Sequence, residues 1–236
     1  MSQLDVKIGD LWLGKDFGLI VGDFTVPPPE VDTYYLEIPG TSDVYDLSEQ
    51  LSGDVEYHQR KALIPLICND GKDLFYSRHS KLLNYCHGRK MPITTNKDSA
   101  FIWNGRVNVD SYEKMFYGGT PTISALVNAF KDEEQSSLLP WKWDNFSFID
   151  GIIRDYFNLS VAGSLNLIII GRRKRVCPTF YNISGTAMTV TYLGNVYTLN
   201  LATPTIITDI FLGEGEHVLT FTGTGMVSVD YRGAML

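Results

Sequence analysis

The sequence predicts a mainly β protein with a single helix and two domains. Short apolar and aromatic runs alternate with glycine and proline along the chain, which is typical of strands joined by tight turns. Only residues 73–87 repeat apolar side chains at helical spacing, and from about Val161 seven short strand-like runs follow at regular intervals. A chain of 236 residues is long enough for two domains of ordinary size.

The first domain is expected to consist of strands around one helix. Apolar runs broken by glycine occupy residues 10–26, and the prolines at 27–29 cannot continue a sheet ladder. Turn chemistry at Pro39 and Gly40 ends the next run. The expected strands cover residues 10–26 as two strands, and then 33–38, 55–66, 101–109 and 120–130.

The expected helix covers residues 73–87, and Gly88 follows it. Glycine just past the last periodic residue supplies the left-handed conformation that helix ends favour. The side chains that recur at spacings of three and four are Leu74, Phe75, Arg78, Leu82, Leu83 and Cys86.

The linker candidate is the polar stretch 131–137, which contains no apolar residue. We therefore expect domains at 1–133 and 134–236, with a linker segment opening the second. The expected strands of the second domain are 165–170, 179–182, 188–192, 196–201, 206–211, 217–221 and 226–231, with turns at 194–195, 213–216 and 223–225. Seven short strands imply a β-sandwich.

Composition argues against several classes. The opening residues lack the apolar run of a secretory signal, and the longest strongly apolar stretch, 165–170, is too short to cross a membrane. Three scattered cysteines predict no disulfide framework, which fits a reducing cytosol. A net charge of -7 argues against a surface that binds nucleic acid throughout.

The one basic run is Arg172, Arg173, Lys174 and Arg175, between an apolar strand and Pro178. It has no stacking aromatics arranged beside it, as a single-strand platform would. A solvated connection between two strands is therefore favoured over a nucleic-acid binding site.

No pattern predicts catalysis, a metal or a cofactor. His79, Cys86 and His87 share part of one helix face, but no second ligand pair stands at zinc-site spacing. The chain has no GxSxG elbow, and its loop carboxylates are those of any acidic surface. The glycine pairs at 213–215 and 223–225 open no helix, so they predict hairpin turns and not phosphate cradles.

Five segments of the chain carry motifs in a fixed order. The densest is YYLEIPGTSDVYDLSEQLSGDVEY at 34–57, completed by Arg60. The others are LNYCHG at 83–88 with FIWNGRV at 101–107, WDNFSFIDGIIR at 143–154, GRRKRVCPTF at 171–180, and DIFLGEGEH at 209–217 with the terminal YRG at 231–233. Together these segments resemble the distal tail protein (Dit) family of siphophages, which forms the tail-tip hub. The first departs from the family pattern at 41–44, where a glycine-containing turn is usual.

This resemblance implies a virion protein of the phage tail, assembled in the host cytoplasm. Its first domain would be tail-tube-like and would form a hexameric ring, and its second would be a galectin-like β-sandwich. The implied partners are the tail tube protein, the tail-tip or tail-associated lysin protein and receptor-binding proteins, with no membrane and with DNA only in transit. Residues 1–133 hold 13 Lys and Arg against 19 Asp and Glu, a balance of -6, so an acidic lumen would let DNA slide.

The possible interface residues are the four cations of 172–175, which the resemblance places near the start of the second domain and which would pair with acids of the first domain or of a neighbouring subunit. Trp141 and Trp143 of the linker motif are the other candidates. An alternative function is a host-surface carbohydrate-binding module, for which Tyr192 and Tyr197 are the stacking candidates. A third class, an enzyme such as a cell-wall hydrolase, has no nominated nucleophile or acid and base pair, and we expect no enzymatic activity.

Overall fold

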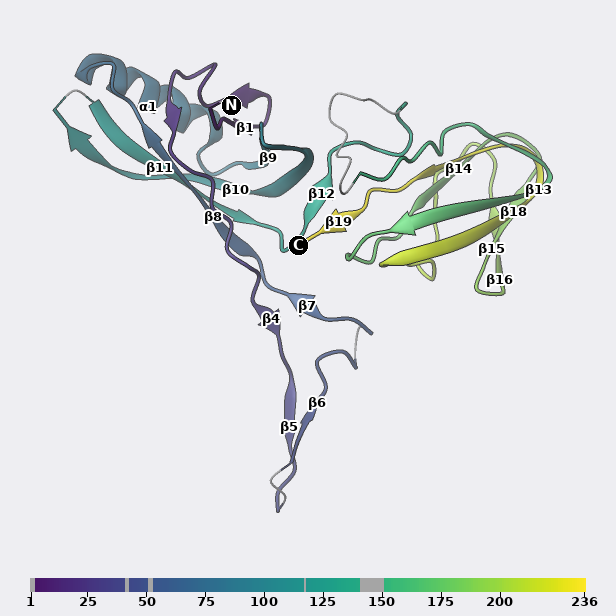
Figure 1. Cartoon of the computed structure of the whole chain (residues 1–236). Coiled ribbons are helices and arrows are strands. Elements are labelled where there is room, and N and C mark those ends of the chain that lie inside the picture. The colour runs from purple at the N-terminus through teal and green to yellow at the C-terminus, as the bar shows by residue number, and fades with distance from the viewer. Residues whose placement is uncertain (1–2, 41–42, 51–52, 117, 141–150) are drawn as a thin grey trace. The chain divides into compact units, whose positions relative to one another are not determined.

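The computed structural model describes residues 3–40, 43–50, 53–116, 118–140 and 151–236. Two compact units divide the chain, one ending at Lys131 and the other running from Asp132 to Met235. The described chain is mainly β with a single helix (Figure 1), which confirms the predicted fold class. Within these residues, no helix has the length and apolar character needed to cross a membrane.

The sheet of unit 1 is antiparallel and runs in the order β2-β1-β9-β10-β11-β8-β3. Its strands are β1 (Val6–Ile8), β2 (Leu11–Trp12), β3 (Ile20–Val21), β8 (Arg60–Ile67), β9 (Lys90–Thr95), β10 (Asp98–Met115) and β11 (Gly118–Val127). Alternate residues of β8 are buried, as expected for a strand with one face on a core.

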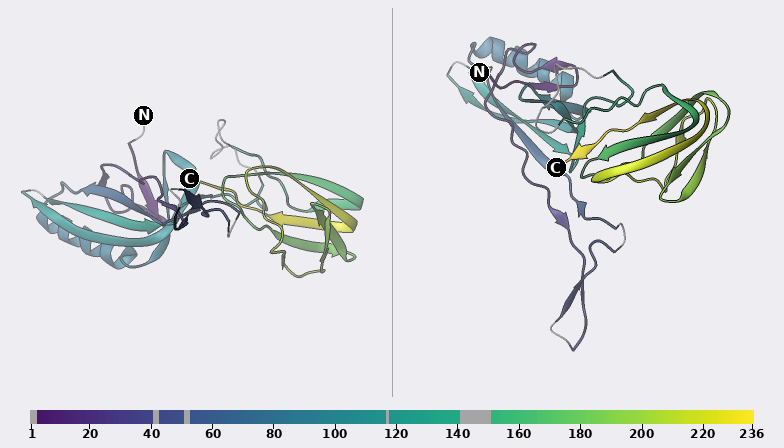
Figure 2. Two further views of the ribbon diagram at one scale, coloured as in Figure 1. Left: turned by 90° about the horizontal axis from the view of Figure 1, so that it is seen from below. Right: turned by 45° about the vertical axis from the view of Figure 1, so that its right-hand side comes forward.

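Helix α1 (Lys72–Cys86) packs on β10 and β11, and the left view of Figure 2 shows it on one side of these strands. Phe75, Leu82 and Cys86 are its buried side chains, so the helical period predicted the packed face. Leu74, expected on that face, is 44% exposed. Gly88, just past the end of the helix, adopts the left-handed conformation at φ 74°, as the sequence predicts.

Between β3 and β8 the chain forms a two-stranded hairpin, which we call the arm (residues 27–59; Figure 1). Its strands are β4 (Val31–Asp32), β5 (Tyr35–Glu37), β6 (Val44–Asp46) and β7 (Glu56–Tyr57). Strand β4 pairs with β7, and β5 pairs with β6. The sequence analysis expected a strand here but not an exposed arm.

The sheet of unit 2 is built on one long strand, β18 (Gly215–Asp230), and runs in the order β16-β15-β18-β14-β17 with β13 also on β18. The other strands of this sheet are β13 (Leu159–Gly171), β14 (Thr179–Gly185), β15 (Met188–Tyr192), β16 (Asn195–Leu199) and β17 (Thr205–Ile206). Two short strands, β12 (Lys131–Glu133) and β19 (Ala234–Met235), lie outside it and pair with each other. Of the expected strand 206–211, only Ile206 lies in a strand, and the rest is irregular with a turn at 208–209, although Ile210 and Leu212 are buried.

The predicted turn at 223–225 is wrong, because both glycines lie inside β18. Gly223 pairs with Gly163 and Gly225 pairs with Val161. A Cβ at Gly225 would lie 1.9 Å from the carbonyl oxygen of Ser184, next to a register shift in β14. These glycines therefore permit close approach of two strands and do not reverse the chain.

The linker candidate 131–137 contains the division between the two units, after Lys131, but several of its side chains are not solvated. Glu133, Ser136 and Ser137 are buried in unit 2. The hydroxyl of Ser137 donates to the carbonyl of Val229 at 2.7 Å and accepts from the N–H of Tyr231 at 2.8 Å. Polar residues without an apolar anchor are held here by hydrogen bonds to residues about 90 positions away, which local composition cannot reveal.

Gly225→Ala should destabilise unit 2 by more than about 4 kcal/mol, because the new Cβ meets backbone that cannot yield. Gly163→Ala is the matched control, since its φ of 89° is equally unfavourable but a Cβ there meets nothing within 4 Å. The control should cost about 1–2 kcal/mol from backbone strain alone. Denaturant unfolding of both variants measures the difference, and equal losses would contradict the close approach.

Candidate interaction surfaces

The arm exposes apolar side chains on both of its faces. Leu36 lies opposite Tyr45 and Glu37 opposite Val44 in the hairpin register. The exposed fractions are large: Tyr34 65%, Tyr35 57%, Leu36 48%, Val44 54% and Tyr45 55%. A two-stranded hairpin with no covered face is marginal in water, so these side chains form a surface that a partner would stabilise.

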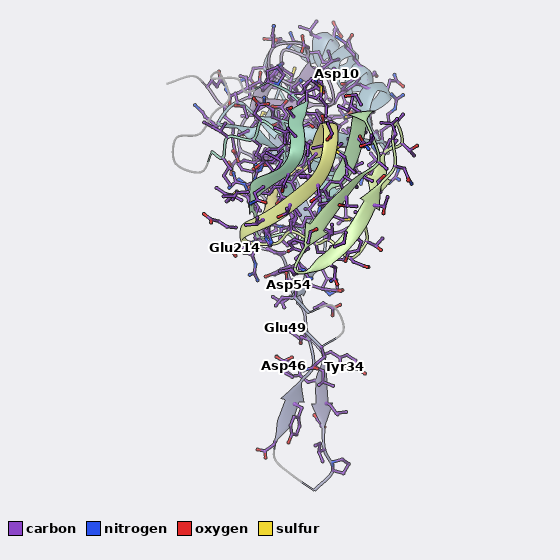
Figure 3. All side chains as sticks on the ribbon, turned by 90° about the vertical axis from the view of Figure 1, so that its right-hand side faces the viewer. Asp10, Tyr34, Asp46, Glu49, Asp54 and Glu214 are labelled. Carbon is purple, nitrogen blue, oxygen red and sulfur yellow. The ribbon has the colours of Figure 1, made fainter. Side chains whose placement is uncertain are left out.

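The arm is also strongly acidic. Residues 27–59 contain eight Asp and Glu and no Lys or Arg. Figure 3 shows Asp46, Glu49 and Asp54 spaced along it. Asp32 and Glu56 lie directly opposite each other in the β4–β7 register, and like charges in that position destabilise a hairpin. His58 approaches Asp32 at 3.8 Å.

The root of the arm is held by Arg60, the residue that ends it. This guanidinium is buried, donates from Nε to the carbonyl of Ala129 at 2.8 Å and from Nη1 to the carbonyl of Pro27 at 3.3 Å, and lies over the Trp103 ring. Burial lowers the pKa of Arg60. The carbonyl of Pro27 marks the start of the arm, so one side chain joins both of its ends.

A cavity of about 240 Å³ lies beside this root. Its walls include Trp103, Phe101 and Phe24, and Lys131 pairs with Asp98 at 2.6 Å while lying over the Phe101 ring. The polar groups at its edge are thus already paired with each other. The cavity is aromatic and small, and it shows no arrangement for catalysis.

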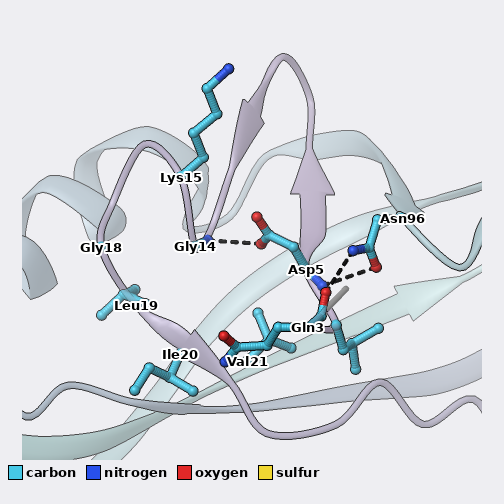
Figure 4. A pocket seen from close by; sticks show the side chains of 10 residues that line it. Gln3, Asp5, Gly14, Lys15, Gly18, Leu19, Ile20, Val21 and Asn96 are labelled. Atoms are coloured by element: carbon cyan, nitrogen blue, oxygen red, sulfur yellow. Dashed lines mark hydrogen bonds between the residues drawn. The ribbon is translucent and has the colours of Figure 1, made fainter. Parts of the chain in front are cut away.

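A second, larger cavity of about 460 Å³ lies between the N-terminal segment and the 14–21 loop (Figure 4). Asp5 accepts from the N–H of Gly14 at 2.8 Å, and Asn96 accepts from the N–H of Asp5 at 3.0 Å. Asn96 also donates to the carbonyl of Gln3 at 2.7 Å. These polar groups fix three chain segments to one another, which is a structural role.

The predicted interface run 172–175 is engaged inside unit 2. Arg172 donates from Nε to Glu133 at 2.6 Å, and Lys174 pairs with Asp132 at 3.3 Å. Arg173 approaches Glu214 at 3.8 Å, and Arg175 lies over the Phe211 ring. Arg172, whose side chain is 12% exposed, is therefore paired with an acid and not solvated. Trp141 and Trp143 lie outside the described residues.

Glu133 is the centre of this network. Its carboxylate also binds Arg154 and accepts from the N–H of Gly233 at 2.9 Å. Burial raises the pKa of Glu133, but Arg154 and Arg172 together outweigh burial and hold the pKa below its usual value. Sequence reasoning did not single out Glu133, because it lies in a run of polar residues, and it named Arg154 only as the end of the 143–154 motif.

The residues considered for metal or sugar are used structurally. Among the residues that the structure describes, no group of three or more His, Cys, Asp and Glu could hold a metal ion. Cys86 is buried, and the ring of His87 accepts from the N–H of Val109 at 3.0 Å. Tyr192 is 7% exposed and its hydroxyl lies 2.8 Å from His217, so it offers no stacking platform.

The chain is thus a two-unit, mainly β protein whose described surface carries one acidic, apolar arm and no recognisable catalytic or metal site. No family model matches the chain, and no curated protein matches it. Among solved structures it is similar to the SPP1 Dit (gp 19.1) protein, titled a paradigm of the hub adsorption apparatus in phages that infect Gram-positive hosts. The identity is 11%, the TM-score is 0.59, and 100% of each chain is covered. The likeness shows a shared fold and confirms, at the level of fold, the resemblance to distal tail proteins.

Glu133→Gln should destabilise unit 2 by about 3 kcal/mol or more, because two buried guanidinium groups lose their shared counter-charge. The pKa of Glu133 is lower in the folded protein than in the unfolded chain, where a glutamate has a pKa of about 4.3. Its stabilising contribution is therefore fully present above that unfolded pKa and is lost as pH falls through the folded pKa. Unfolding followed from pH 7 to pH 3 should therefore show a steeper acid loss in wild type than in the variant. Glu134→Gln, at an exposed neighbour, should leave both stability and slope unchanged.

Proposed function

We propose that this chain is a hub protein of a phage tail, located in the virion and acting mechanically and not as an enzyme. The observation that carries the proposal is the fold shared over the full length of both chains with a solved hub protein of the phage adsorption apparatus. The absence of a catalytic arrangement among the described residues is compatible with it but carries no weight of its own.

In this proposal, unit 1 is the tail-tube-like domain and six copies of it form a ring. The ring joins the tail tube above to the tail-tip or tail-associated lysin protein below, and its channel passes DNA. Unit 2 is the galectin-like domain, which carries receptor-binding proteins where the phage has them. The exposed arm supports assembly, because it presents apolar side chains that a single copy leaves in water.

The acidic lumen expected from the sequence needs revision. Of the 19 Asp and Glu in residues 1–133, eight lie in the arm, and the remaining 11 are fewer than the 13 Lys and Arg. The acidic excess of this half therefore belongs to the arm and not to the sheet. Any acidic lining of the channel depends on where the arms lie in the ring.

Subunit counting by native mass spectrometry and light scattering, over a range of concentrations, tests the ring directly. We expect six copies, and a six-fold ring in negative-stain images. A protein that stays monomeric under every condition and also fails to bind tail-tube and tail-tip proteins would overturn the proposal.

The arm variant Leu36→Ser/Tyr45→Ser should abolish assembly with little change in melting temperature, because both side chains are more than 40% exposed in the single copy. The matched control is Val196→Ser/Ile206→Ser, which removes two exposed apolar side chains of unit 2 and should assemble normally. If the arm variant assembles as wild type does, the arm has no part in the ring.

A further inference from the structure

The charge of this protein is divided unevenly between the arm and the rest. The arm has a formal charge of -8, while the remaining residues hold 20 Lys and Arg against 19 Asp and Glu. The part of unit 1 outside the arm holds 13 Lys and Arg against nine Asp and Glu. Since the arm contains no Lys or Arg, the cations that neutralise it in a complex must come from another surface.

A matching surface exists on the sheet of unit 1, on the face opposite α1. Arg106 of β10 lies directly opposite Lys90 of β9 on one side and Leu126 of β11 on the other. Leu126 in turn lies opposite Lys61 of β8. Directly paired residues project from the same face of a sheet, so these four side chains form one row across four strands, which we call the basic row.

The basic row is exposed and partly apolar. All three cations are exposed, Leu126 is 48% exposed, and Leu63 two residues along β8 is 40% exposed. Their sequence neighbours Ala62, Ala125 and Val107 are buried in the core with Phe75 and Leu82 of α1, which places the row on the outward face. An acid of this face, Asp110, accepts a hydrogen bond from Ser124 at 2.9 Å.

The dimensions of the row suit an extended hairpin. Four neighbouring strands span three interstrand spacings, about 14 Å. A hairpin strand advances about 7 Å for every second residue, so two or three alternate side chains of an arm would cover the row. Glu37 and Val44 share one face of the arm, and Leu36 and Tyr45 share the other, so the arm offers both acidic and apolar groups along this length.

We propose that the basic row of one copy receives the acidic arm of a second copy, with Lys61, Lys90 and Arg106 facing arm carboxylates and Leu63 and Leu126 covering arm apolar side chains. This inference rests on the proposed ring and names the surface that forms it. The competing occupant of a row of cations is DNA, which three positive charges would hold only weakly at physiological salt.

Charge reversal and compensation test the pairing. The receiving variant is Lys61→Glu/Arg106→Glu, and the arm variant is Glu37→Lys/Glu49→Lys, which avoids Asp46 because Asp46 is bound to Ser48 within the hairpin. Each should raise the concentration for half-assembly by on the order of tenfold or more, and raised salt should weaken the wild-type ring. The four substitutions combined in one chain should restore assembly.

Two controls keep the outcomes distinct. Lys15→Glu/Lys114→Glu makes the same change of net charge at exposed positions away from the row, and it should assemble as wild type does. Unchanged melting temperatures should show that every variant is folded. If the wild-type protein never assembles, the proposed function itself is overturned. If the wild-type ring forms and the charge reversals do not weaken it, the role of the basic row is overturned. The same holds if the four combined substitutions fail to restore assembly. Loss of DNA binding in a gel-shift assay with assembly unchanged would assign the row to DNA and would also overturn it.

Discussion

The arm depends on one interaction, the contact of the Arg60 guanidinium with two backbone carbonyls. Burying a cation is costly unless its donors are satisfied, and here carbonyl oxygens accept from the guanidinium while the Trp103 ring lies against it. The acceptors belong to Pro27 and Ala129, which are remote in sequence from each other. The chain therefore leaves and re-enters the sheet at one fixed point, and everything between is free to project.

Fixing the root while leaving the arm exposed divides unit 1 into a packed core and a segment whose apolar side chains are uncovered. The core of unit 1 gathers apolar residues from all its main strands and from α1, and no arm residue belongs to it. The arm instead has opposed acids at Asp32 and Glu56 and uncovered aromatic side chains. A two-stranded segment of this kind is marginal in water by itself, so a partner that bound it in the proposed ring would stabilise it.

The sequence predicted those elements whose signal is local and periodic. The helix at 73–87 was found within one residue at each end, because Phe75, Leu82 and Cys86 must share a packed face. Long-range features were missed: Gly223 and Gly225 resemble turn residues until Ser184 is known to lie against them, and Glu133 resembles a linker acid until Arg154 and Arg172 surround it. The arm had a readable signal, the lack of any Lys or Arg from Pro27 to Gln59, which the search for strands did not weigh.

An interface between the arm and the basic row would join two different surfaces of the same chain. Such a heterologous contact repeats from copy to copy, and it closes into a ring only when the angle between successive copies is right; otherwise it continues as a filament. That angle is set by the direction in which the arm leaves its own sheet, and Arg60 holds the point of departure. In the proposed ring, Arg60 would therefore position the arm as well as stabilise its root, since a loosened root would let the same attractive surfaces meet at many angles. The two acceptors at the root are backbone carbonyls, whose directions are fixed by the chain that carries them, whereas a flexible carboxylate would allow the root to turn.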